Sequence, residues 1–213
     1  MSKLAFIFPG QGAQKAGMGK DFYENSEAAR SFFDQAQKIL DFDLKEMCFG
    51  EHEELNLTEY TQPCMVSVCL AIVQELKKRG INPDITAGLS LGEYAAVAAA
   101  GGMNELDAIK LVRRRGILMQ STVPAGEGAM AAVLGLDAKK IEEILESFEN
   151  VWIANYNCPG QIVITGLTNE VQQASLALKE AGAKRVVELK VSGQFHSLLL
   201  KQTGEALLKE MES

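Results

Sequence analysis

The stretch TAGLSLGEY, residues 86–94, decides how the rest of the chain is interpreted. It holds a Gly-x-Ser-x-Gly pattern centred on Ser90. The segment DITA at 84–87 predicts a short buried strand before it, and an alanine-rich segment at 93–100 predicts a helix after it. A serine on a tight turn between strand and helix is typical of a nucleophile elbow, where the helix N-terminus also favours negative charge. By itself the pattern favours a glycine-rich turn with a capping serine, and with the strand-turn-helix context the two interpretations fit equally well.

Composition and charge exclude several classes of function. The 213 residues are 47% hydrophobic, enough for a sizeable core, and the formal net charge of -7 without a long basic run argues against nucleic acid as a partner. We find no apolar run long enough to span a bilayer, and we expect no signal peptide, because the N-terminus leads directly into a predicted strand. The four cysteines lack metal-like spacing, so we expect no metal, reduced thiols and a cytoplasmic protein.

A second glycine loop, FPGQG at 8–12, follows the strand predicted at 3–8. It does not match a Rossmann fingerprint, because Lys15 stands where a glycine is needed. It does not match a Walker loop either, because Gly19-Lys20 is followed by Asp21. The loop is therefore a candidate for the second N–H donor of an oxyanion hole, or an ordinary tight turn.

Periodicity predicts further helices at 21–40, from 61 to about 79 and at 104–121, with an irregular acidic segment at 46–60. On the wheel of helix 104–121, Arg115 lies in the middle of the apolar stripe, whereas Arg113 and Arg114 lie off it. An inward-facing guanidinium needs an anionic or carbonyl partner. Arg115 either binds a substrate carboxylate or forms a buried ion pair.

The second half of the chain changes pattern. Strands are predicted at 129–135, 151–157, 161–166 and 185–191, and helices at 138–148 and 169–181, before a last helix at 198–211. The order β-α-β-β-α-β is that of a ferredoxin-like unit. We therefore predict an α/β fold with two parts. Residues 1–124 and 192–213 form a hydrolase-like large subdomain with a parallel sheet, and residues 125–191 form an inserted ferredoxin-like small subdomain.

The chain has two histidines, and they differ in their surroundings. His52 lies in the acidic segment, where we expect it to be solvated. His196 follows a predicted strand and a glycine, as a loop-borne catalytic base would. A core or surface histidine is the alternative, but a base for Ser90 is the interpretation that we favour.

Four motifs occur together in a recognisable order. They are FPGQG at 8–12, GLSLGE at 88–93, Arg115-Gly116 and Phe195-His196-Ser197. With them the chain resembles the malonyl-CoA:acyl carrier protein transacylase family of fatty-acid and polyketide synthesis along its whole length. Members of that family continue past the last helix predicted here, so the resemblance implies that a C-terminal part is absent.

The resemblance implies a role for each matching residue. Ser90 is the nucleophile that takes up the malonyl group, and His196 is the general base and acid. The backbone N–H groups of Gln11 and Leu91 form the oxyanion hole. Arg115 binds the malonate carboxylate.

The resemblance also implies the substrates. The partners are malonyl-CoA and the phosphopantetheine thiol of acyl carrier protein, in fatty-acid biosynthesis, with no cofactor. Asn155 and Asn157 lie where the family's cleft meets the small subdomain, although amides that cap the turn before Pro159 are an alternative. Two other functions stay open: a thioester hydrolase with the same serine and histidine, and a catalytically impaired fragment or docking module. Arg115 argues against the hydrolase if its partner is a substrate carboxylate.

Overall fold

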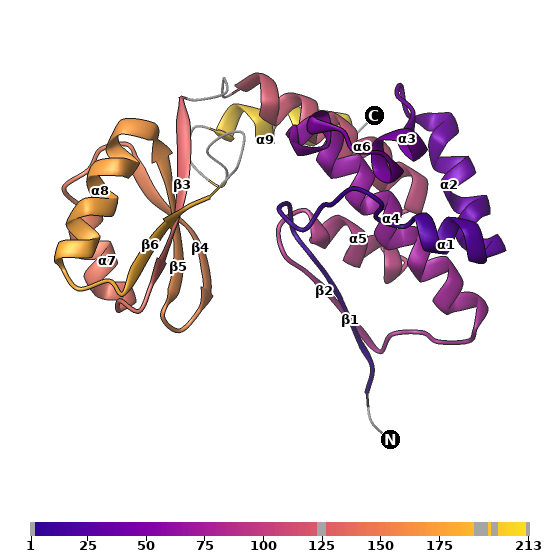
Figure 1. The fold of residues 1–213 in the computed structure, drawn as a ribbon, viewed down its shortest axis with the longest axis horizontal. Coiled ribbons are helices and arrows are strands. Elements are labelled where there is room, and N and C mark those ends of the chain that lie inside the picture. The colour runs from indigo at the N-terminus through magenta and orange to yellow at the C-terminus, as the bar shows by residue number, and fades with distance from the viewer. Residues whose placement is uncertain (1–2, 123–126, 190–195, 197–199, 212–213) are drawn as a thin grey trace. The chain divides into compact units, whose positions relative to one another are not determined.

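The computed structural model describes residues 3–122, 127–189, 196 and 200–211 (Figure 1). The chain divides into two compact units: Met1–Leu118 with Lys209–Ser213, and Met119–Leu208. The second unit is longer than the insertion predicted at 125–191, because it also takes in the end of one helix before it and most of the last helix. The end of the strand predicted at 185–191 and the start of the helix predicted at 198–211 lie outside the described residues.

The first unit contains a parallel pair of strands. β1 (Ala5–Phe8) pairs with β2 (Ile85–Gly88), with Phe8 opposite Gly88 at their carboxyl ends. Parallel strands end at the same edge of a sheet, so the loop after β1 and the turn after β2 emerge side by side. This pairing brings the two glycine motifs of the sequence together.

Among the described residues 3–122, seven helices lie between or after these two strands along the chain. They are α1 (Lys20–Asn25), α2 (Glu27–Ile39), α3 (Leu44–Phe49), the 3₁₀ helix η1 (Glu53–Asn56), α4 (Thr58–Lys78), α5 (Gly92–Ala99) and α6 (Glu105–Thr122). Asn104 caps α6 by accepting from the Leu106 and Asp107 N–H groups. Among the described residues, no helix has the length and apolar character needed to cross a membrane.

Two expectations for this region are wrong. The helix predicted at 21–40 breaks at Ser26, whose side chain accepts a hydrogen bond from the Ala29 N–H and begins a new helix there. The segment at 46–60 is not irregular, because α3 begins after the Asp43 cap and α4 begins at Thr58 rather than at Thr61. The cap residues can be read in the sequence, but the acidic composition of the segment favoured the interpretation that it is irregular.

The helices cover one face of the parallel pair. Phe8 is buried in the core, and Thr86 donates a hydrogen bond to the Ala96 carbonyl of α5. The side chains of alternate residues point to the opposite face, where Ile7 is 79% and Ile85 62% exposed. The parallel sheet therefore has one packed face and one bare apolar face among the described residues.

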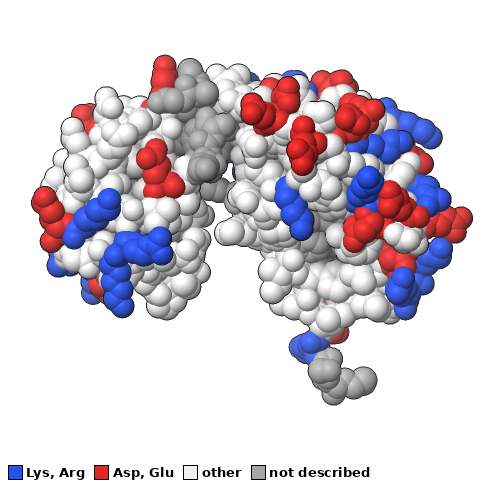
Figure 2. Space-filling view, viewed as in Figure 1, with Lys and Arg blue, Asp and Glu red and all other residues white. Residues whose placement is uncertain are grey.

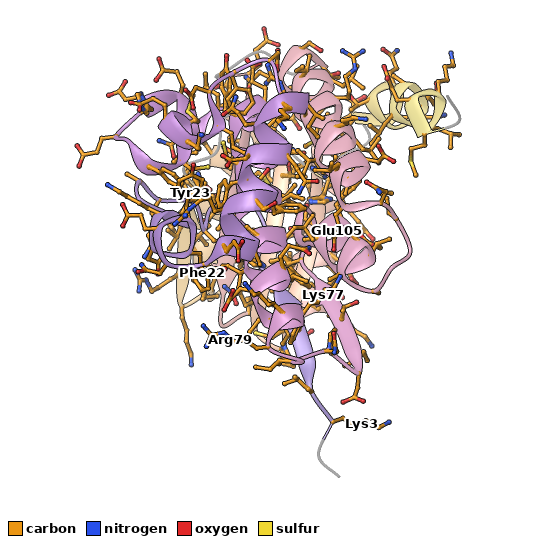
Figure 3. The ribbon with its side chains drawn as sticks, turned by 90° about the vertical axis from the view of Figure 1, so that its right-hand side faces the viewer. Lys3, Phe22, Tyr23, Lys77, Arg79 and Glu105 are labelled. Atoms are coloured by element: carbon orange, nitrogen blue, oxygen red, sulfur yellow. The ribbon has the colours of Figure 1, made fainter. Side chains whose placement is uncertain are left out.

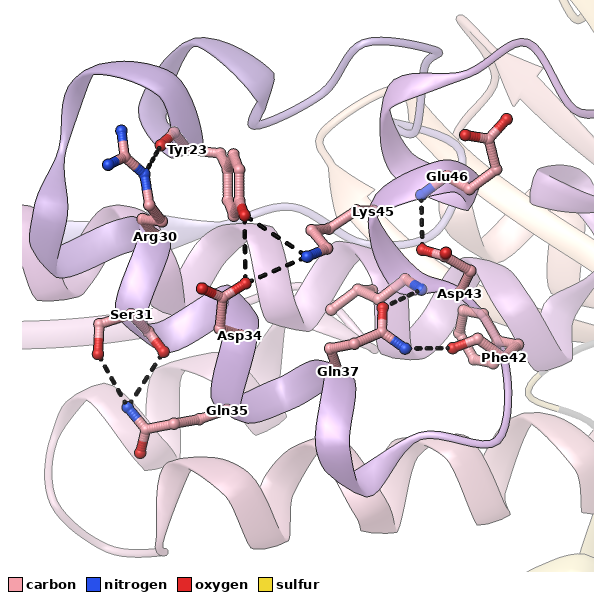
Figure 4. Close-up of polar contacts among 11 residues, drawn as sticks. Tyr23, Arg30, Ser31, Asp34, Gln35, Gln37, Phe42, Asp43, Lys45 and Glu46 are labelled. Carbon is pink, nitrogen blue, oxygen red and sulfur yellow. Dashed lines mark hydrogen bonds and ion pairs between the residues drawn. The ribbon is translucent and has the colours of Figure 1, made fainter.

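Charged side chains tie the helices of the first unit together at its surface. Lys45 Nζ and Tyr23 Oη each lie 3.2 Å from Asp34 Oδ1 (Figure 4). Lys77 and Glu105 face each other with 2.9 Å between Nζ and Oε1 (Figure 3). Both signs of charge are interspersed over these helices (Figure 2). We assign these pairs a structural role. Exposed ion pairs of this kind contribute about 0–1 kcal/mol each to the stability of the fold.

The second unit is built on a four-stranded antiparallel sheet. Its elements are β3 (Gly128–Leu134), α7 (Ala138–Leu145), β4 (Val151–Cys158), β5 (Gln161–Leu167), α8 (Thr168–Glu180) and β6 (Arg185–Glu188), followed by α9 (Lys201–Met211). The sequence order β-α-β-β-α-β is as predicted, and the strand order in the sheet is β4-β5-β3-β6.

Both faces of this sheet are packed. The helices α7 and α8 lie on one face (Figure 1), where Val133, Ile164 and Leu178 belong to one buried cluster. A second cluster, around Met130 and Val163, lies on the other face. The five central residues of both β3 and β5 are buried as a result.

Candidate active site

Ser90 stands on the turn between β2 and α5, in the predicted strand-turn-helix setting. Its φ of 51° lies in the left-handed region. A Cβ on Gly88 would lie 2.1 Å from the Gly92 carbonyl carbon, and a Cβ on Gly92 would lie 2.3 Å from the Phe8 carbonyl oxygen. Only glycine fits at either position, so the Gly-x-Ser-x-Gly spacing is required by the way the two turns pack.

The loop after β1 lies directly against this turn. The Leu89 N–H donates to the Phe8 carbonyl at 3.1 Å, and a Cβ on Gly10 would lie 2.8 Å from the Leu89 carbonyl oxygen. Gln11 therefore comes from a loop in contact with the turn that carries Leu91. Leu91 is also the N-cap of α5, at the positive end of the helix dipole, which favours an anion. The arrangement suits two backbone donors on neighbouring loops.

The side chain of Arg115, on α6, lies beside α5. Its Cζ lies 5.4 Å from the centroid of the Tyr94 ring, in the first turn of α5. Burial lowers the pKa of the Arg115 guanidinium, while Tyr94 and Glu93 act in the opposite direction. An arginine stays protonated at neutral pH even so. The structure thus places a partly desolvated cation beside α5, the helix that follows the Ser90 turn.

Arg113 contradicts the prediction from the helical wheel. It is only 9% exposed, and its guanidinium donates to both carboxylate oxygens of Asp41, at 2.9 and 3.0 Å. It also donates to the Glu59 carbonyl at 2.8 Å, and its Cζ lies 5.2 Å from the ring centroid of Phe42 and 4.9 Å from that of Tyr60. The wheel misplaced it because its partners come from segments far away in the sequence.

The charges around Arg113 support a structural role. Burial lowers the pKa of Arg113, but the Asp41 and Glu59 carboxylates outweigh that effect and raise it overall. The Arg113 hydrogen bonds hold the pKa of Asp41 below its usual value. Arg114, by contrast, is exposed and pairs with Glu210 at 2.7 Å.

The other predicted site residues, His196, Asn155 and Asn157, lie in the second unit, whereas Ser90 lies in the first. His196 is exposed. Asn155 of β4 stands opposite Val163 of β5. Asn157 falls in a register irregularity of β4 between Tyr156 and Cys158. Phe195 and Ser197, which flank His196, lie outside the described residues.

Ser90 and His196, which the sequence motifs single out, also have strained backbone conformations. Among the described residues, Ser90 and His196, with φ values of 51° and 58°, are the only non-glycine residues with positive φ. Such conformations cost free energy and concentrate at functional sites. In the described part of the chain, no group of three metal-binding side chains comes together.

Thr58 is a candidate site residue that the sequence patterns did not single out. It is fully buried at the start of α4, and its Oγ1 accepts a hydrogen bond from Gln11 Nε2 at 3.0 Å. Thr58 lies within the segment at 46–60 that is predicted to be irregular, so no helix is predicted to begin there. A threonine three residues before the apolar helix predicted from 61 was the available signal.

Comparison with known families decides what kind of domain carries these residues. The acyl transferase domain family matches residues 5–213. The chain belongs to the acyl transferase domain family. This acyl transferase domain is 48% identical to the malonyl CoA-acyl carrier protein transacylase of Bacillus subtilis (strain 168), over 100% of the chain and 69% of that protein.

Solved structures agree with this membership. The domain matches a malonyl CoA-acyl carrier protein transacylase from Clostridium perfringens with 42% identity and a TM-score of 0.93, over 99% of this chain and 68% of the other. It also matches a malonyl-transacylase solved in complex with a type II PKS acyl-carrier protein, with 39% identity and a TM-score of 0.94, over 99% and 70% of the respective chains. The acyl transferase domain therefore spans about two thirds of the length of these proteins.

Proposed function

We propose that this acyl transferase domain moves a malonyl group from malonyl-CoA to the phosphopantetheine thiol of acyl carrier protein, through an ester on Ser90. The observation that carries the proposal is the elbow: a serine with positive φ, between tightly packed glycines, at the N-terminus of a helix. The names of the relatives, and the complex of one of them with a carrier protein, support the choice of acyl group and acceptor.

The chemistry follows from the roles proposed for the side chains. Ser90 Oγ attacks the thioester carbonyl carbon while His196 accepts its proton. The backbone N–H groups of Gln11 and Leu91 bind the oxyanion of the tetrahedral intermediate. When the C–S bond breaks, His196 returns the proton to the departing CoA thiol. The carrier thiol then attacks the seryl ester, and the same steps run in reverse.

Arg115 is proposed to select the acyl group. Its guanidinium can bind the free carboxylate of the malonyl group with two parallel hydrogen bonds. Its position beside Tyr94, on the helix that begins at the elbow, supports that role. We propose that Asn155 and Asn157 of β4 line the substrate cleft from the second unit.

The finer description of the fold and setting belongs to the same proposal. We describe the first unit as hydrolase-like and the second as ferredoxin-like, on the basis of its β-α-β-β-α-β order and antiparallel sheet. The reaction as written uses no cofactor, since the protein side chains supply every proton transfer. We propose that it takes place in the cytoplasm.

Intact-mass spectrometry after incubation with malonyl-CoA tests the proposal. We expect one malonyl adduct on the wild-type chain, none on Ser90→Ala, and transfer of the adduct when carrier protein is added. A full adduct on Ser90→Ala would place the nucleophile elsewhere. Release of free malonate at the same rate with and without carrier protein would identify a hydrolase instead. A wild-type chain that takes up no malonyl group would contradict the proposed transfer.

A further inference from the structure

The loop that follows β1 is attached by side-chain amides to the segment just before and at the start of α4. Gln11 Nε2 donates to Thr58 Oγ1 at 3.0 Å. Gln14 Nε2 donates to Asn56 Oδ1 at 3.1 Å, and its Oε1 accepts from the Gly12 N–H at 2.7 Å. Two glutamines thus fix one short loop to residues 56–58.

This loop needs an external support. It forms no helix or strand, and Gly12 has a φ of 109°, a conformation that glycine adopts without steric cost. An oxyanion hole works only when its donors are held in place before the charge develops. A side chain anchored in a buried, hydrogen-bonded position provides such support.

Thr58 is well placed to be that anchor, because its own position is fixed from a second direction. A Cβ on Gly116 of α6 would lie 2.8 Å from the Thr58 carbonyl oxygen and 2.7 Å from Glu59 Cα. From the same helix, Arg113 donates to the Glu59 carbonyl and to its carboxylate, at 2.8 and 3.1 Å. The first turn of α4 is therefore clamped by the helix that carries Arg115.

We propose that Thr58 is a positioning residue for acyl transfer. Its buried hydroxyl holds the Gln11 side chain, and through it the Gln11 backbone N–H stays directed at the oxyanion. Thr58 is fully buried, so we expect it to act on catalysis through Gln11 and not by contact with the substrate. The proposal rests on the function proposed above, in which the Gln11 N–H is an oxyanion donor.

Paired variants test the link. Thr58→Val keeps the shape and removes the acceptor, Thr58→Ser keeps the hydroxyl, and Gln11→Met removes the donating amide. We expect Thr58→Val and Gln11→Met each to lower kcat for malonyl transfer by about ten- to a hundredfold, the usual scale for a small misplacement. KM should change by less than about twofold, and Thr58→Ser should restore most of the rate. The double variant should be no slower than either single one, because both remove the same hydrogen bond.

Thr165→Val is the matched control. Thr165 is as fully buried as Thr58, but it lies in the second unit, and its hydroxyl has no hydrogen-bond partner among the described residues. This variant should leave kcat unchanged. A loss in Thr165→Val equal to that in Thr58→Val would show a general effect of removing a buried hydroxyl and would overturn the proposal.

Amide hydrogen exchange gives a readout that needs no catalysis. In Thr58→Val and Gln11→Met the Gln11 and Gly12 amides should exchange faster, while those in the middle of α4 stay as in the wild type. Unchanged loop exchange would overturn the proposal, as would faster exchange along all of α4 without rescue by Thr58→Ser. If the wild-type chain transfers no malonyl group, the proposed function fails, and the exchange arm still decides whether Thr58 holds the loop.

Discussion

The two sheets of this acyl transferase domain differ in how completely they are covered. In the second unit both faces of the antiparallel sheet are packed, and Ile164 at its centre is 0% exposed. In the described part of the first unit the parallel pair packs on one face, and Ile7 on the other face is 79% exposed. Parallel sheets are normally covered on both faces. The better-buried sheet is not the one that carries Ser90.

This difference shows where the geometry of the candidate site comes from. The turns around Ser90 are fixed by backbone-to-backbone packing at Gly88 and Gly92 and by hydrogen bonds to α4 and α5. All of these contacts lie on the covered side or at the carboxyl edge of the sheet. The site therefore depends on its turns and helices more than on the bare face of the strands.

Substitution of Gly92 should give the largest effect. A Cβ there meets the Phe8 carbonyl oxygen at 2.3 Å, so Gly92→Ala must push the two turns apart. We expect a loss of more than about 4 kcal/mol in the unfolding free energy of the first unit. Hydrogen exchange resolved by unit measures it, and the second unit should be unaffected.

The control for this variant is a glycine with free space around it. Gly204 lies inside α9, and a Cβ there would have no neighbour within 4 Å. Gly204→Ala should stabilise the helix by about 0.5–1 kcal/mol. Equal destabilisation by both alanines would contradict the account of the elbow.

A matched pair of isoleucines tests the contrast between the sheets directly. Ile164→Ala should cost about 2–5 kcal/mol, because it leaves a cavity in a packed core. Ile7→Ala should change stability by less than about 0.5 kcal/mol, as for other exposed positions. Chemical denaturation of the two variants gives both values. A large cost at Ile7 would show that the bare face is covered in solution.

Removal of the Arg113 side chain should have an intermediate, pH-dependent effect. Arg113→Met leaves Asp41 without its cation, and because Asp41 is partly solvated we expect a loss of about 1–3 kcal/mol at pH 7. The folded pKa of Asp41 lies below its unfolded value, so the pair stabilises the fold above the unfolded pKa. That contribution is lost as the pH falls through the folded pKa.

Urea denaturation of both proteins between pH 7 and about pH 3 measures this dependence. The difference between wild type and Arg113→Met should shrink as the pH falls past the usual carboxyl range. A difference that stays constant with pH would exclude the Asp41 pair as its source.

Local signals in the sequence predicted much of the fold. The elbow at Ser90 was predictable because strand, turn and helix are adjacent and the glycine spacing reflects one steric constraint. The β-α-β-β-α-β order of the second unit was predictable because each element carries its own periodicity. Strand order and the bare face of β1 were not, because they depend on which segments meet in three dimensions.

The wrong prediction for Arg113 and the omission of Thr58 also arise from contacts between segments that are distant in the sequence. Arg113 was expected off the packed stripe, yet Asp41 and Glu59, each more than fifty residues away, bury it. Thr58 escaped notice because its partner Gln11 lies 47 residues earlier. A helical wheel shows which face a residue occupies, but it does not show which polar groups approach that face. The pairing of Ser90 with His196 and the roles of Asn155 and Asn157 stay predictions.

We propose that Ser90 and Arg115 together form a site for an acyl group that carries a carboxylate. The ratio of malonyl to acetyl adduct on Ser90 tests it, measured by mass spectrometry for wild type, Arg115→Ala, Arg115→Lys and Arg114→Ala. A charge-assisted pair contributes about 1.5–3 kcal/mol. Arg115→Ala should therefore lower the ratio by roughly ten- to a hundredfold.

The other two variants sharpen the result. Arg115→Lys should recover only part of the ratio, because an ammonium cannot form the two-pronged contact. Arg114→Ala should leave it unchanged, since Arg114 pairs with Glu210 at the surface. An equal fall of both adducts in Arg115→Ala would make Arg115 a structural ion-pair residue and would contradict the claim.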